Sequence, residues 1–117
     1  MIKKITAETR DGAVQHVQRN LPDDAVADSL ARLFKVLGDP TRVRILWILS
    51  IEELCVDDLS QVTEMSQSAV SHQLHILRQA KLVRPRREGR KVFYRLADAH
   101  VSLLFSQGLE HVQEKEE

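Results

Sequence analysis

Apolar positions recur every three or four residues along much of the chain, which is the period of one face of an α-helix. The clearest case is residues 23–37, whose apolar stripe consists of Val26, Leu30, Leu33, Phe34 and Leu37. We expect this helix to begin at Asp23 or Asp24 and to end at Gly38. An acidic side chain can cap a helix start, and glycine favours a helix end. The pattern therefore predicts an amphipathic helix.

A second helix is predicted directly after the first. Asp39 is placed to cap it, and Pro40 takes its first position, where the missing N–H of proline costs nothing. Residues 43–49, which include Trp47, are apolar nearly all round the helix. A helix without a polar face belongs in the interior, so we expect this one to be central and buried.

The third and fourth helices are predicted to form a helix–turn–helix. A short helix runs from about Cys55 to Val62, and residues 63–65 form the turn. Ser66 then caps a longer helix that reaches about Ala80. On this helix the apolar stripe consists of Val70, Leu74 and Leu77, and the outward positions are Gln67, Ser68, Ser71, His72, His75 and Arg78.

The remaining pattern predicts a β-hairpin and one more helix. Residues 82–87 and 91–96 are short extended runs on either side of Gly89. Helical spacing then returns between about Asp98 and Glu114, with apolar positions at Val101, Leu104, Phe105, Gly108 and Val112. This order of elements is that of a winged helix–turn–helix, a mainly α fold with a small β-hairpin.

Charges are balanced overall but unevenly distributed. Lys plus Arg and Asp plus Glu each number 17, whereas residues 81–91 hold six basic side chains and only one acidic one. A polar helix face alone is more often solvated than DNA-binding, but here a basic hairpin follows it directly. The second helix of a helix–turn–helix offers polar side chains to base edges, and basic side chains on a wing contact phosphates. We therefore predict that double-stranded DNA is bound by Ser66, Gln67, Ser68, Ser71, His72 and Gln73 on the helix and by Arg86, Arg87, Arg90 and Lys91 on the wing.

Two pairs of metal-ligand residue types lie on the last predicted helix, Asp98 with His100 and His111 with Glu114. The two histidines are about 16 Å apart along the helix axis. Zinc holds nitrogen ligands at roughly 2.0–2.1 Å, so no single ion can bind both histidines of one chain. His100, His111 and Glu114 share one helix face. If the helices of two copies pack antiparallel, Asp98 and His100 of one copy meet His111 and Glu114 of the other. This predicts two four-ligand sites that exist only in a homodimer.

The 117-residue chain suffices for one compact domain and little more. Residues 1–22 are polar and weakly patterned, so we interpret them as a flexible N-terminal arm and residues 23–117 as the DNA-binding and dimerisation domain. A single cysteine, Cys55, excludes an intrachain disulfide and fits a reducing compartment. The sequence contains neither a signal-peptide core nor an apolar run of membrane-spanning length. We therefore expect a cytoplasmic protein without a membrane partner.

Four segments together resemble the ArsR/SmtB family of metal-sensing transcriptional repressors. They are residues 33–46 (LFKVLGDPTRVRIL), 53–59 (ELCVDDL), 66–74 (SQSAVSHQL) and 88–94 (EGRKVFY), and the resemblance covers about residues 25–114. It implies a dimer whose metal-free form binds operator DNA and releases it when metal binds. The direction of regulation comes from the resemblance alone, because neither composition nor spacing supplies it.

The resemblance also implies where metal binds. The family's C-terminal pattern is matched by Asp98, His100, His111 and Glu114. The glutamate resembles zinc sensors, and such nitrogen and oxygen ligands suit zinc, or cobalt in the same geometry. At a second family location, Asp57 stands where a second thiolate would be needed, so sensing of arsenic, cadmium or lead is not expected there. An auxiliary site formed by Cys55 and Asp58 with His16 from the arm of the second chain stays open.

Structural alternatives stand beside these predictions. Asp98 can act as a helix cap, Glu114 can belong to a solvated acidic tail, and Cys55 can be a small buried residue. The whole chain can also be a winged-helix interaction module, or a regulator that responds to another metal or to a non-metal effector. An enzyme is not expected, because the clustered ligands leave no open metal position and no nucleophile–base pair is visible.

Overall fold

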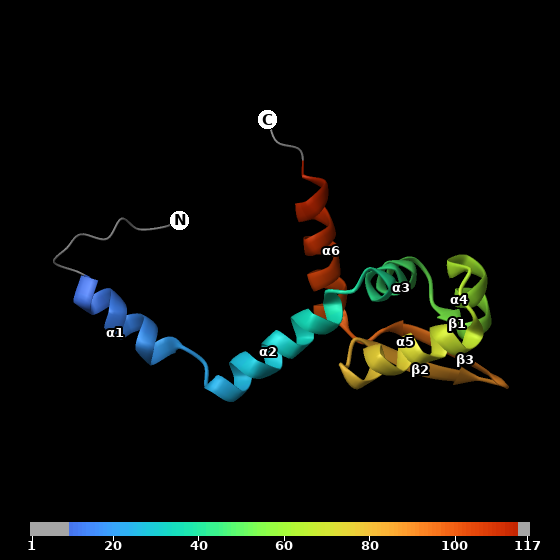
Figure 1. The fold of residues 1–117 in the computed structure, drawn as a ribbon, viewed down its shortest axis with the longest axis horizontal. Coiled ribbons are helices and arrows are strands. Elements are labelled where there is room, and N and C mark those ends of the chain that lie inside the picture. The colour runs from blue at the N-terminus through green and yellow to red at the C-terminus, as the bar shows by residue number, and fades with distance from the viewer. Residues whose placement is uncertain (1–9, 115–117) are drawn as a thin grey trace. The chain divides into compact units, whose positions relative to one another are not determined.

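The computed structural model describes residues 10–114. Within them the chain separates into two compact units, residues 10–32 and residues 33–114, with the division inside helix α2. The elements are α1 (Arg10–Asn20), α2 (Asp24–Leu37), α3 (Pro40–Ile51), β1 (Leu54–Cys55), α4 (Val56–Thr63), α5 (Gln67–Gln79), β2 (Val83–Glu88), β3 (Lys91–Leu96) and α6 (Ala99–Gln113). This order confirms the predicted winged helix–turn–helix (Figure 1).

Helix α1 was not predicted. The polar, weakly patterned residues 1–22 predict a flexible N-terminal arm, whereas Arg10–Asn20 form a regular helix with no buried residue. A helix that buries no face shows no clear apolar stripe, so its period is hard to recognise. The side chain of Asn20 donates to the carbonyl of His16 at 2.8 Å near its C-terminal end. Residues 1–9 lie outside the described residues, and the flexibility of the arm stays a prediction.

The core of the second unit is built on α3. The Asp39 side chain accepts a hydrogen bond from the Arg42 backbone N–H at 3.0 Å, with proline next to it at the first helical position, as predicted. Ile45, Leu46 and Leu49 are buried. The expectation that α3 is buried all round is wrong on one side, since the side chain of Trp47 is 42% exposed. Helix α3 therefore carries an outward apolar surface as well as the core.

Helices α4 and α5 form the helix–turn–helix. Glu64 ends α4 in the left-handed conformation, with φ of 60°. Ser66 then caps α5, because its hydroxyl accepts a hydrogen bond from the Ala69 N–H at 3.1 Å. The predicted stripe is confirmed, since the buried residues of α5 are Val70, Leu74 and Leu77.

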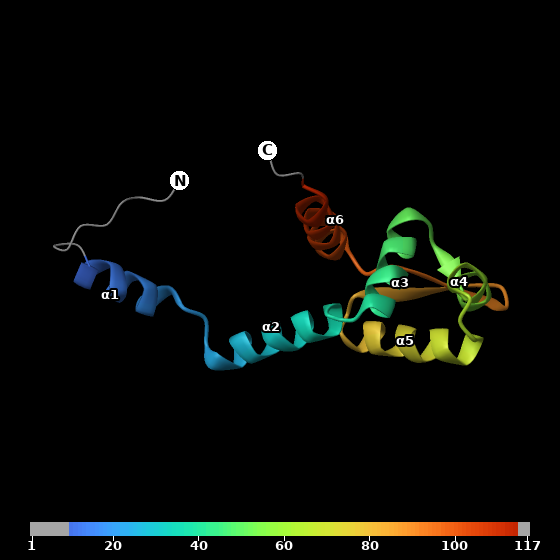
Figure 2. The same ribbon diagram turned by 45° about the horizontal axis from the view of Figure 1, so that its top comes forward.

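The wing is part of a three-stranded antiparallel sheet with the order β1-β3-β2. Strands β2 and β3 pair from Val83 opposite Leu96 to Glu88 opposite Lys91, and Gly89 at the tip has φ of 63°. Both views show the hairpin tip projecting past α4 and α5 (Figure 1; Figure 2). Strand β1 was not predicted, because a two-residue strand shows no alternation and is defined only by its pairing with β3.

Helix α6 follows the sheet and contacts both α3 and β3. Asp98 caps it, and the last residue of the predicted helix, Glu114, is instead the C-cap, with an extended backbone. Trp47 of α3 packs against Phe105 of α6 with ring centroids 6.4 Å apart. Among the described residues, no helix combines the length and apolar character that crossing a membrane requires.

Candidate nucleic-acid interface and metal centre

The first turns of α5 present a polar, exposed surface. Ser68, Ser71 and His72 are exposed there, as predicted from the sequence. Hydroxyl and imidazole groups can donate to or accept from base edges. They are three of the six α5 residues predicted to contact bases. Among residues 10–114, no other side chain forms a hydrogen bond with them.

The other three α5 residues predicted to contact bases have hydrogen-bond partners within the chain. The hydroxyl of Ser66 is the helix cap described above, and the Gln67 amide donates to Asp57 Oδ1 at 2.9 Å. Gln73 is half-buried, and its carbonyl oxygen accepts from Arg42 Nη1 at 3.5 Å. These contacts order α5 against its surroundings. A base contact by Gln67 or Gln73 would compete with them, and their role in DNA binding stays a prediction.

The tip of the wing carries free basic charge. Arg87, Arg90 and Lys91 are all exposed around Gly89, and none forms an ion pair within residues 10–114. The positive φ of Gly89 makes the tight turn possible without strain. Three unpaired cations on a projecting hairpin form a surface suited to phosphates.

Arg86 differs from the other predicted wing residues. Its guanidinium forms ion pairs with Glu53 and, at 2.8 Å, with Glu88, and it lies 5.2 Å from the ring centre of Phe93. The hydrogen bond to Glu53, followed by that to Glu88, raises the pKa of Arg86. The predicted phosphate contact would have to break these interactions, so the structure favours a positioning role that ties the wing to the segment before β1.

Arg42 is a positioning residue that sequence reasoning missed. Its Nε donates to the carbonyl of Val36 at 2.7 Å, and its Nη1 reaches Gln73. One side chain thus joins the end of α2, the start of α3 and the recognition helix. The sequence indicated its position in the first turn after Asp39. Its partner on α5, Gln73, lies 31 residues away along the chain, so no local pattern indicated that contact.

The first candidate metal half-site lies at the start of α6. The Asp98 carboxylate accepts a hydrogen bond from the Val101 N–H at 3.1 Å through Oδ1, and His100 Nδ1 lies 3.5 Å from the same oxygen. The Val101 hydrogen bond lowers the pKa of Asp98, and the nearby His100 acts in the same direction. Both of these contacts use Oδ1, and the His100 side chain is 96% exposed. The cap and a metal contact can therefore use different carboxylate oxygens.

The second half-site lies at the other end of the same helix. His111 Nδ1 is 3.9 Å from Glu114 Oε2, and the His111 side chain is 85% exposed. Imidazole nitrogen and carboxylate oxygen are donors that zinc accepts, so both pairs have suitable chemistry. Within residues 10–114 of one chain, no three His, Cys, Asp or Glu side chains come together as a metal site. Each half-site holds at most two ligands, and a four-ligand site needs a second chain.

The auxiliary candidates belong to different units of the chain. Cys55 is buried, and its backbone N–H donates to Asp58 Oδ2 at 3.4 Å, which makes this pair the N-terminal cap of α4. His16 belongs to α1 in the first unit, where its Nδ1 lies 3.3 Å from the Asn20 amide nitrogen. Among the described residues of one chain no third ligand joins Cys55 and Asp58, and metal binding there stays a prediction.

Comparisons with known proteins agree with this architecture. Residues 39–84 match the family model "Bacterial regulatory protein, arsR family". The chain is 45% identical to a transcriptional repressor SmtB homolog of Synechocystis sp. over 88% of its own length and 78% of that protein. It is 40% identical to the transcriptional regulator NmtR of Mycobacterium tuberculosis, covering 80% of this chain and 81% of NmtR.

Solved structures lead to the same family. A homodimeric winged helix-turn-helix DNA-binding domain from Mycobacterium bovis, described as a possible ArsR-family regulator, has a TM-score of 0.75 at 32% identity and covers 83% of this chain and 93% of that chain. The solution structure of apo-NmtR has a TM-score of 0.69 at 39% identity, covering 80% and 78%. The protein is therefore a member of the ArsR/SmtB family of winged helix–turn–helix transcriptional regulators, which are DNA-binding proteins and not enzymes.

Proposed function

We propose that this protein is a zinc-responsive repressor that acts as a homodimer. In this proposal the metal-free dimer binds operator DNA through α5 and the wing. Asp98 and His100 of one chain, with His111 and Glu114 of the other, hold zinc and thereby weaken DNA binding. The observation that carries the proposal is the placement of two exposed donor pairs at opposite ends of α6, beside an unpartnered apolar groove.

The groove supports a dimer through α6. It lies between α3, α6 and the end of α2, has a volume of about 380 Å³, and is lined entirely by apolar residues and glycine. Its walls include Phe34, Trp47, Leu104, Phe105, Leu109 and Val112. A second copy of α6 would remove this surface from water, and a two-fold axis would place the same groove opposite itself.

An antiparallel pair of α6 helices completes both metal sites at once. The start of one helix then lies beside the end of the other, so each half-site meets the complementary pair. Asp98 orients the start of the helix through its cap while leaving Oδ2 for a ligand contact. Glu114 lies at the C-cap just beyond the helix, where its extended backbone lets the side chain reach outside the helical face. Zinc bound by these four groups would cross-link the two chains, and cobalt suits the same donors.

DNA binding follows from the paired recognition elements. A two-fold dimer presents two copies of α5, which must enter successive major grooves about 34 Å apart. Helix α3 contacts both α5 and α6, so a change in how the α6 helices pack alters the positions of the recognition helices. If metal and DNA favour different arrangements, each weakens the binding of the other by the same factor.

The names of relatives support the metal response. The Synechocystis protein is named a transcriptional repressor, and a relative from Staphylococcus aureus, 41% identical over 73% of this chain, is named a cadmium resistance regulatory protein. The ligand types separate the present chain from soft-metal sensing, because its single thiol is buried. Zinc is therefore the metal that the exposed donors fit best.

A zinc titration of the purified metal-free protein tests the proposal. We expect two zinc ions per dimer and release of a labelled duplex taken from the region upstream of the gene. His111→Ala should bind that duplex normally without zinc but lose the zinc response, whereas His75→Ala on α5 should keep the ratio of affinities with and without zinc. Zinc-driven release that persists in His111→Ala would reject the α6 site.

A further inference from the structure

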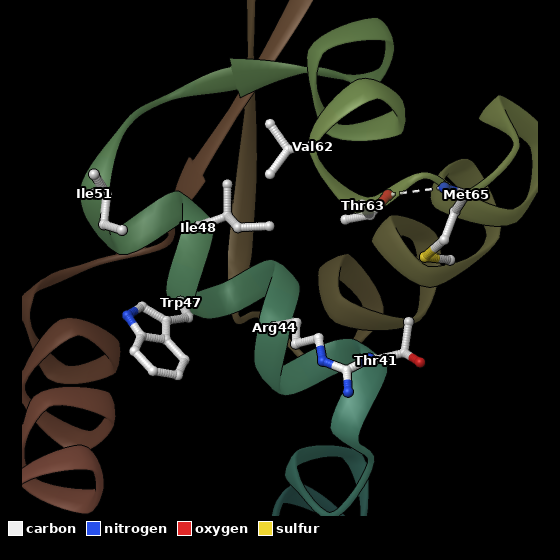
Figure 3. A pocket seen from close by; sticks show the side chains of 8 residues that line it. All are labelled: Thr41, Arg44, Trp47, Ile48, Ile51, Val62, Thr63 and Met65. Carbon is white, nitrogen blue, oxygen red and sulfur yellow. Dashed lines mark hydrogen bonds between the residues drawn. The ribbon is translucent and has the colours of Figure 1, made fainter.

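A second hollow lies on the side of α3 that the core does not use. It is formed by α3, the end of α4 and the turn before α5, and its volume is about 530 Å³ (Figure 3). Pockets for small organic ligands fall in the range of roughly 300–1,000 Å³. Neither the proposed metal sites nor the basic tip of the wing lies among its lining residues. This hollow is called the α3–α4 pocket below.

Most of the α3–α4 pocket is apolar. The side chains of Trp47, Ile48, Ile51, Val62 and Met65 line it. Ile51 is 73% exposed, and Val62 and Trp47 are also exposed, so large apolar side chains meet water here. An apolar body placed against them would be stabilised by removal of that surface from water.

The other end of the pocket is polar and carries one positive charge. Thr41 and Arg44 come from the first half of α3 and lie next to each other, and Thr63 contributes a further hydroxyl (Figure 3). Arg44 is the only charged residue of the lining. No carboxylate among residues 10–114 lies within ion-pair distance of it. The Thr63 hydroxyl donates to the Leu59 carbonyl at 2.7 Å and accepts from the Met65 N–H at 3.3 Å, so it is fixed and already satisfied.

The charged end and the apolar end are separated along α3. Ile51 lies seven positions after Arg44, which corresponds to about 10 Å of helix. A guanidinium binds a carboxylate through two parallel hydrogen bonds. We propose that the α3–α4 pocket binds a small amphipathic carboxylate, with the carboxylate on Arg44 and an aliphatic or aromatic body against Trp47, Ile51 and Val62.

Octanoate is a suitable probe, and octan-1-ol is its uncharged counterpart. Trp47 is the only tryptophan of the chain, so its fluorescence reports on the full-length protein without a label. Because Trp47 also borders the groove beside α6, amide NMR shifts must identify the site. We expect saturable binding of octanoate with shifts at Thr63 and Met65. Shifts confined to Leu104 and Val112 would overturn the proposal.

Matched variants test the charge and the apolar end separately. Arg44→Gln should weaken octanoate binding about tenfold, as expected for loss of a charged hydrogen-bond partner, and leave octan-1-ol unaffected. Arg32→Gln, outside the lining, should change neither. Ile51→Asp, at an exposed position, should weaken both probes. An equal loss of affinity for octanoate and octan-1-ol in Arg44→Gln would refute the proposal. Octanoate binding that does not saturate would also refute it. Shifts of the Thr63 and Met65 amides as protein concentration rises, without octanoate binding, would instead assign the pocket to a second copy of the chain.

Discussion

Asp98 holds the start of α6 by accepting a hydrogen bond from the backbone N–H of Val101 at 3.1 Å through Oδ1, while its side chain stays 55% exposed. One side chain therefore has a structural role and a proposed ligand role that substitution can separate. Asparagine is as good a helix cap as aspartate, but it is a poorer zinc ligand because it carries no charge.

We expect Asp98→Asn to keep the thermal stability of the metal-free protein and to weaken zinc binding at least about tenfold, in line with loss of a ligand or its support. Asp98→Ala should lower both the thermal stability and the affinity for zinc, because alanine cannot cap the helix. Thermal unfolding and a competition titration against a zinc chelator measure the two effects. Equal zinc affinity in the wild type and Asp98→Asn would remove Asp98 from the ligand set.

The cap also predicts a pH dependence of the metal-free protein. The Val101 hydrogen bond lowers the pKa of Asp98 in the folded state. A group with a lowered folded-state pKa stabilises the fold above its ordinary pKa, which is about 3.9 for aspartate, and that stabilisation is lost as the pH falls through the folded-state value. A carbon-13 NMR titration should show the Asp98 carboxyl titrating below the ordinary range. A normal or raised midpoint would contradict the cap, and Asp98→Asn should flatten this part of the stability profile.

Two arginines of the wing should behave differently. Arg90→Gln removes an exposed cation at the tip and should weaken operator binding while reducing the slope of log affinity against log salt concentration by about 1, with unchanged thermal stability. Arg86→Gln breaks the ion pairs with Glu53 and Glu88 and should lower the thermal midpoint.

Glu53→Gln is the matched control for this comparison. It removes the ion pair with Glu53 but keeps the one with Glu88, so it should reproduce part of the loss of stability without removing a cation from the wing. Fluorescence anisotropy at several salt concentrations and thermal unfolding provide the measurements. If Arg86→Gln changes only the salt slope, Arg86 is a phosphate contact and not an anchor.

The elements that the sequence predicted correctly are those with local signals. Asp39 with its following proline, Ser66 and Gly89 each set a cap or a turn through neighbouring backbone groups, and all three act as expected. Strand β1 was not predicted, because Leu54 and Cys55 become a strand only by pairing with residues about 40 positions later. Helix α1 was not predicted, because it buries no face.

The candidate site shows the same difference between local and long-range contacts. Asp98 with His100 and His111 with Glu114 are close in sequence, and the structure brings each pair to within 4 Å. The Arg86–Glu53 pair spans 33 residues and the Arg42–Gln73 contact spans 31, so no local pattern revealed them. Joining the two metal half-sites requires a second chain, which the pattern within one helix suggests but cannot fix.

Adjacent leucines on α6 test whether the groove beside that helix is the dimer interface. Leu104 lines the groove and is 40% exposed, whereas Leu103 lies outside the lining and is 58% exposed. Leu104→Glu should raise the dimer dissociation constant at least about 100-fold, because a two-fold interface contains the buried charge twice. Leu103→Glu should change it less than about threefold, as expected for an exposed position. Sedimentation equilibrium measures both constants, and operator affinity should fall in parallel with dimerisation. Equal effects of the two substitutions would place the interface elsewhere and leave the α6 half-sites without the second chain that they need.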